Sequence, residues 1–194
     1  SSVTLVIGLF FFLLIWINRI ELFGILPEDF IDGIYVFLYL MIGRVLDMYL
    51  GLNGTIFVTS SKYRYDVLFT FSLIIIVFVL NLYLIPTYGI AGAAISTTIA
   101  YIIYNIGRLI FVWIAFNLHP FRWSQLKVAV FFLMVGLLFE LVEFNFHNDF
   151  VTIFARWGLY LLLVSIGFIG LKIEPEITNY AMKLKTSLLK KVRK

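Results

Sequence analysis

Cysteine is absent from the 194-residue chain, and only two histidines are present. The lack of cysteine excludes disulfide bonds and thiol chemistry, and with so few histidines we expect no metal site. Motifs that cradle phosphates or carry hydrolytic chemistry are missing too, since there is no P-loop, GxGxxG, HExxH or GxSxG pattern. We therefore expect neither an enzyme nor a bound cofactor.

Charged residues are scarce as well. Charged residues make up 13% of the chain, against 62% apolar and 19% aromatic residues, whereas soluble domains are nearer half apolar and a quarter charged. Because so few polar side chains cannot cover a surface in water, the sequence predicts an all-α, polytopic membrane protein. The net charge of +4 comes from basic residues gathered at one end, so we expect membrane lipids and no nucleic acid as partners.

Six apolar segments are long enough to cross about 30 Å of hydrocarbon, which takes about 20 residues. Together they predict a six-helix bundle over residues 1–172, followed by a basic amphipathic tail at 173–194 that suits anionic headgroups. The chain starts inside an apolar run without a signal-peptide pattern, so we expect a segment of a longer protein. The predicted spans are roughly 3–20, 30–58, 66–85, 89–117, 125–145 and 150–172.

The basic residues outside the spans predict the orientation of the bundle. In a six-span arrangement eleven of the fifteen Lys and Arg residues fall on one side, which by the positive-inside rule is the cytoplasmic side. Both ends of the segment are then cytoplasmic. The eleven are Lys62, Arg64, Arg122, Lys127, Lys172, Lys183, Lys185, Lys190, Lys191, Arg193 and Lys194.

The stretch NLYLIPTYGIAGAAIS at 81–96 places a proline and several small residues between two bulky spans. A proline disfavours the helical conformation of the residue before it, so we expect the third span to end at Pro86. Small residues let helices approach closely in lipid. Pro86, Gly89 and Gly92 therefore predict a tight hairpin of two spans.

The same stretch carries a family resemblance. Its NxxLIPxYGIxGAA pattern, together with GRVLDMYLGLNGTIFVTSSKYRYD at 43–66 and YNIGRLIFVWIAFNLHPF at 104–121, resembles the multidrug/oligosaccharidyl-lipid/polysaccharide (MATE-like) flippase superfamily. The similarity is to its polysaccharide and lipopolysaccharide exporters and covers about residues 3–170.

This resemblance implies one half of a transporter built from two six-helix bundles that face each other across a cavity. The chain would be the C-terminal half, its partner the N-terminal six-helix half, and its substrate a lipid-linked oligosaccharide moved across the bacterial inner membrane by alternating access. Two alternatives stay open. One is half of a cation-coupled multidrug exporter, and the other is a non-transporting structural subunit of a polysaccharide assembly complex.

Ionisable residues inside predicted spans are candidate site residues, because each costs about 2.5–3.5 kcal/mol or more at mid-depth. Arg44 and Asp47 lie three residues apart on one helical face, as either a structural ion pair or a cavity-lining pair in which Arg44 binds a pyrophosphate. Arg108 either reaches toward the cytoplasmic side or joins Arg44 in a basic cavity. Asn53 and Asn105 complete the candidates. For Asn53 the simpler role is to bridge helices.

Overall fold

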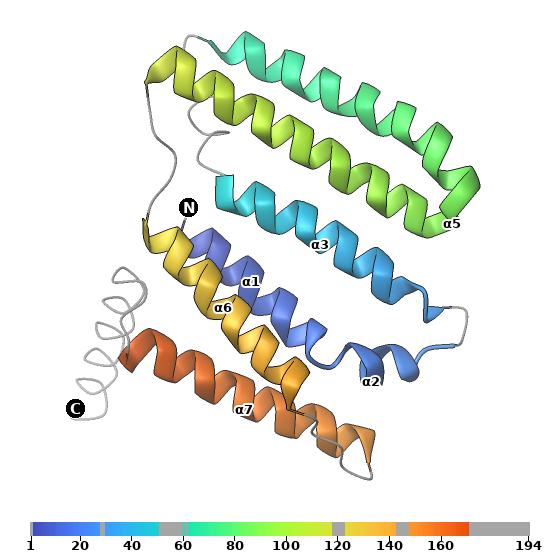
Figure 1. The fold of residues 1–194 in the computed structure, drawn as a ribbon, viewed down its shortest axis with the longest axis vertical. Coiled ribbons are helices and arrows are strands. Elements are labelled where there is room, and N and C mark those ends of the chain that lie inside the picture. Colours follow the sequence, from blue (N-terminus) through green and yellow to red (C-terminus); the bar gives the residue numbers. More distant parts are fainter. Residues whose placement is uncertain are drawn as a thin grey trace, which may run out of the picture. The chain divides into compact units, whose positions relative to one another are not determined.

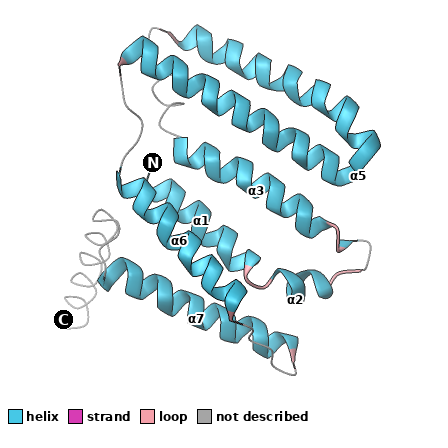
Figure 2. Ribbon diagram, viewed as in Figure 1, coloured by secondary structure: helices cyan, strands magenta, loops and turns pink. Residues whose placement is uncertain are grey.

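The computed structural model describes residues 2–27, 30–50, 60, 62–117, 123–142 and 148–170. Within these ranges every regular element is a helix, which confirms the predicted all-α class (Figures 1 and 2). Asn53 and the basic tail at 173–194 lie outside the described residues. The helices are α1 (Ser2–Trp16), α2 (Arg19–Gly24), α3 (Gly33–Leu50), α5 (Tyr63–Phe116), α6 (Trp123–Leu141) and α7 (Asp149–Gly170).

Three helices of the described residues are long and apolar enough to cross a membrane: α5, α6 and the Asp149–Phe168 part of α7. Helix α1 is apolar but shorter. Helices suit lipid because their backbone groups bond within the segment. One side of α5 is a continuous apolar surface, whose members are each more than half exposed: Leu68, Phe71, Ile74, Ile75, Phe78 and Leu82. A hydrocarbon solvent accounts for this surface, so the fold is compatible with a membrane protein.

Helix α5 is a hairpin. Its one non-helical residue is Gly89, with φ 58° and ψ −135°, and the chain reverses direction there (Figure 1). Only glycine adopts such a conformation without strain. The helix end predicted at Pro86 is corrected, because Pro86 lies inside the first limb, residues 63–88. Proline has a helical φ but removes one backbone hydrogen bond and crowds the preceding turn. The first limb nevertheless continues to Tyr88.

The second limb, residues 90–116, packs closely against the first near the turn. Gly92 is buried, and a Cβ atom there would meet the backbone of the first limb at Leu84, with its carbonyl carbon 2.6 Å away. The Ser96 hydroxyl donates to the Gly92 carbonyl at 2.7 Å, so this polar group is satisfied within its own helix. A side chain larger than hydrogen at position 92 would force the limbs apart.

The chain divides into two compact units. The first holds residues 3–8 and 19–121, and in it α3 lies along the second limb of α5 (Figure 1). A Cβ on Gly43 would lie 3.4 Å from the Thr98 Cα, and the Thr98 hydroxyl donates to the Tyr39 carbonyl. Small residues and one interhelical hydrogen bond thus join the two helices, as expected for helices in lipid.

The second unit holds residues 9–18 together with α6 and α7. Three side chains of α7 donate hydrogen bonds to backbone carbonyls of the neighbouring segment: Arg156 to Ile17 at 3.0 Å, Trp157 to Leu14 at 2.9 Å and Tyr160 to Phe10 at 2.9 Å. Helix α1 ends at Trp16, earlier than the predicted span end at residue 20. Near this end the Leu14 carbonyl accepts from Trp157, so it is satisfied from outside its own helix.

Candidate functional site

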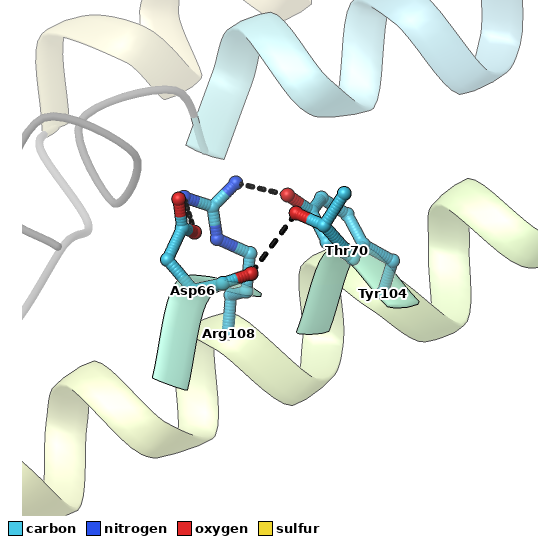
Figure 3. Close-up of polar contacts among 4 residues, drawn as sticks. All are labelled: Asp66, Thr70, Tyr104 and Arg108. Atoms are coloured by element: carbon cyan, nitrogen blue, oxygen red, sulfur yellow. Dashed lines mark hydrogen bonds and ion pairs between the residues drawn. The ribbon is translucent and has the colours of Figure 1, made fainter. Parts of the chain in front are cut away.

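An ion pair joins the two limbs of the α5 hairpin. The Arg108 guanidinium, on the second limb, lies 2.8 Å from the Asp66 carboxylate, which belongs to the first turn of the first limb (Figure 3). The Arg108 side chain is 10% exposed and the Asp66 side chain 24% exposed. Each charge therefore neutralises the other in a largely dehydrated place, where losing one partner is costly.

Tyr104 completes the surroundings of Arg108. The guanidinium donates to the Tyr104 hydroxyl at 2.7 Å and stands 4.9 Å from the centre of the Tyr104 ring (Figure 3). The Thr70 hydroxyl donates to the Asp66 backbone carbonyl at 2.9 Å, one turn further along the first limb. Arg108 thus contacts the opposite limb at Asp66 and its own limb at Tyr104.

Arg44 is held differently. Its guanidinium stands 5.0 Å from the centre of the Tyr101 ring, and the side chain is exposed. Among the described residues no ion pair is recorded for Arg44, including with Asp47, which is half-buried on the same helix. A cation over an aromatic face keeps its charge and its hydrogen-bond donors. Arg44 can therefore receive an anion.

The two arginines lie on neighbouring tyrosines of the second limb. The Tyr101 and Tyr104 rings meet edge to face with centres 6.5 Å apart, Arg44 lies over the first and Arg108 over the second. Tyr101 is near the middle of the second limb, so this tyrosine pair lies at mid-depth if the limb spans a bilayer. We name Arg44, Tyr101, Tyr104, Arg108 and Asp66 the arginine–tyrosine cluster.

Asn105 does not extend this cluster. The residue is 4% exposed, and its side-chain amide donates to the Tyr101 carbonyl of its own helix at 3.0 Å. This bond to the preceding turn satisfies the amide donor within its own helix. In the part of the chain that the structure describes, no group of three or more His, Asp or Glu residues could hold a metal ion.

Asp66, Tyr101 and Tyr104 are members of the cluster that the sequence did not single out. For Asp66 a signal was present. The signal that could have found it is the register of the hairpin, because Asp66 and Arg108 lie at similar distances along the chain from Gly89. Tyr65 and Phe111, whose ring centres are 4.8 Å apart, show the same register.

Comparison with protein-family models, curated proteins and solved structures finds no match to this chain. The resemblance to the flippase superfamily therefore stays a prediction.

Proposed function

We propose that this chain is one half of a membrane flippase that moves an anionic lipid-linked oligosaccharide across the bacterial inner membrane. In this proposal the six predicted spans form one wall of a cavity, and a second six-helix half forms the other. Movement by alternating access needs a cavity with few charged groups and no catalytic motif, which agrees with the lack of such motifs in the sequence.

The observation that carries the proposal is the difference between the two arginines. Arg108 is neutralised by Asp66, whereas Arg44 lies on Tyr101 with no acidic partner recorded among the described residues. A cation without a counter-charge is costly inside a membrane and marks a functional site by default. Arginine binds phosphate oxygens through two parallel hydrogen bonds, so a pyrophosphate linking lipid and sugar is the ligand that Arg44 fits.

The acidic residues distinguish a flippase from a multidrug exporter. A site for organic cations needs an uncompensated carboxylate at depth, and the Asp66 carboxylate is paired with Arg108. Asp47 is the remaining candidate on α3. A flippase depends on Arg44 and tolerates Asp47→Asn, whereas a cation exporter depends on Asp47.

The test is translocation in vesicles that contain the complete transporter. A fluorescent lipid–pyrophosphate–sugar is placed in both leaflets, and membrane-impermeant quenching reports its movement. A hydrogen-bonded charged contact contributes about 1.5–3 kcal/mol, so Arg44→Ala should slow translocation about thirtyfold. Arg44→Lys should keep part of the rate, because the charge stays while the paired hydrogen bonds are lost. An unchanged rate in Arg44→Ala would overturn the proposal.

A further inference from the structure

A cavity of about 910 Å³ lies where the turn of α5 meets the start of α3. Tyr88 and Gly89 line it from the hairpin turn, and Asp32, Tyr35 and Tyr39 line it from the start of α3. Its volume falls within the range of small-molecule sites, roughly 300–1,000 Å³. The cavity is separate from the arginine–tyrosine cluster, none of whose residues line it.

Four of the eleven described residues that line this cavity are aromatic. Phe30, Tyr35 and Tyr88 are each more than half exposed, so these aromatic side chains are accessible to a ligand. The negative face of an aromatic ring attracts weakly positive C–H groups, which a sugar ring presents on its flatter side. The tyrosine hydroxyls add donors and acceptors at the ring edges.

Asp32 supplies the charge of the wall. It is the charged residue among the described lining residues, and its carboxylate is recorded in no hydrogen bond or ion pair with the described chain. A free carboxylate accepts hydrogen bonds from hydroxyl groups and repels phosphates and acidic sugars. No arginine or lysine lines the cavity among these residues, so its chemistry is opposite to that of Arg44.

We infer that this cavity binds an uncharged oligosaccharide, with its sugar rings stacked on Tyr35 and Tyr88 and a hydroxyl group bound by Asp32. That this sugar belongs to the lipid-linked substrate rests on the proposed function. Gly33 in the cavity wall and Arg44 are eleven residues apart on α3, or ~16 Å at about 1.5 Å per residue. One extended substrate therefore reaches both places, with its pyrophosphate at Arg44 and its sugar at the hairpin turn.

The experiment measures binding of free sugars by saturation-transfer NMR to the complete protein in nanodiscs of uncharged phospholipid. The probes are a glucose trimer, an N-acetylglucosamine trimer and tetraethylammonium. The cavity variant is Tyr88→Leu, and its matched control is Tyr83→Leu, since Tyr83 is 73% exposed on the same limb and does not line the cavity. An aromatic contact contributes about 0.5–1.5 kcal/mol, or up to about tenfold in affinity.

We expect at least one neutral trimer to bind, with an affinity about tenfold lower in Tyr88→Leu and unchanged in Tyr83→Leu. Asp32→Asn should weaken binding only about threefold, because an amide oxygen still accepts a hydrogen bond. Equal loss in Tyr83→Leu, or binding by neither trimer, overturns the inference and leaves an aromatic belt at the membrane surface. Binding of tetraethylammonium that Asp32→Asn abolishes overturns it in favour of an organic-cation site.

This experiment is independent of the pyrophosphate. The free sugars carry no phosphate, so failed translocation in the Arg44 test leaves a sugar-binding result standing. Conversely, neither trimer binds in the other outcome, while translocation still depends on Arg44. That result shows that the flippase holds its substrate by the lipid and pyrophosphate alone.

Discussion

Replacing Gly92 with alanine tests the close contact between the limbs of α5. The added Cβ would meet Leu84 backbone atoms, at 2.6 Å from the carbonyl carbon, and also lie 3.0 Å from the Ile85 backbone nitrogen. Backbone atoms cannot rotate away, so the cost should lie near the upper end of the roughly 1–3 kcal/mol seen for overpacking. The better helix propensity of alanine offsets up to about 1 kcal/mol of this cost. We expect a net loss of about 2 kcal/mol, or about thirtyfold in the unfolding constant.

The assay is unfolding of the purified chain in mixed micelles by increasing SDS, followed by far-UV circular dichroism. Gly158→Ala is the matched control, because Gly158 lies inside α7 and its added Cβ meets nothing within 4 Å. That variant should be neutral or gain up to about 1 kcal/mol. If Gly92→Ala behaves like Gly158→Ala, the limbs do not approach as described.

Three further variants test other parts of the structure by the same unfolding assay. Gly89→Ala should cost about 1–3 kcal/mol, since the residue holds φ 58°, and no loss would argue against the turn. Asp66→Asn should cost about 2 kcal/mol, because it leaves the Arg108 charge without its partner. Adding Arg108→Gln should recover part of this loss. If the losses of the two single variants simply add in the double variant, the two residues are not coupled. Tyr160→Phe removes a hydrogen bond between helices and should cost about 0.6 kcal/mol. The control Tyr83→Phe should cost nothing. Equal losses in both variants would show that the Tyr160 hydroxyl does not stabilise the helix contact.

Composition and hydropathy predicted the helical class and the approximate helices, because both depend on local properties of the chain. The segment predicted at 125–145 corresponds to α6 (Trp123–Leu141), and the one at 150–172 to α7 (Asp149–Gly170). Helix ends were predicted less well where the decisive partner is distant. The carbonyls of Leu14 and Ile17, near and just beyond the end of α1, accept from Trp157 and Arg156, which lie far along the chain and carry no local signal.

In the candidate site, too, the sequence predicted local features better than contacts between distant residues. Arg44 and Arg108 were identifiable from the sequence because they are charged residues inside apolar segments. The residues that they contact depend on how the neighbouring helices align. The local spacing suggested a pair of Arg44 with Asp47, whereas the structure places Arg44 on Tyr101 and pairs Arg108 with Asp66. Position 66 becomes a partner only once the turn is placed at Gly89. Glycine conformation, rather than the more visible Pro86, therefore sets which residues of the two limbs meet.

The most direct measurement is native mass spectrometry of the protein released from its own membranes in mild detergent, as wild type and as Arg44→Ala. We expect the wild-type protein to carry a bound species that yields phosphate and sugar fragments, and the Arg44→Ala protein to have lost it. Phospholipid as the sole bound species, or equal retention of the sugar-containing species in Arg44→Ala, would contradict Arg44 as the cation that holds an anionic lipid-linked sugar.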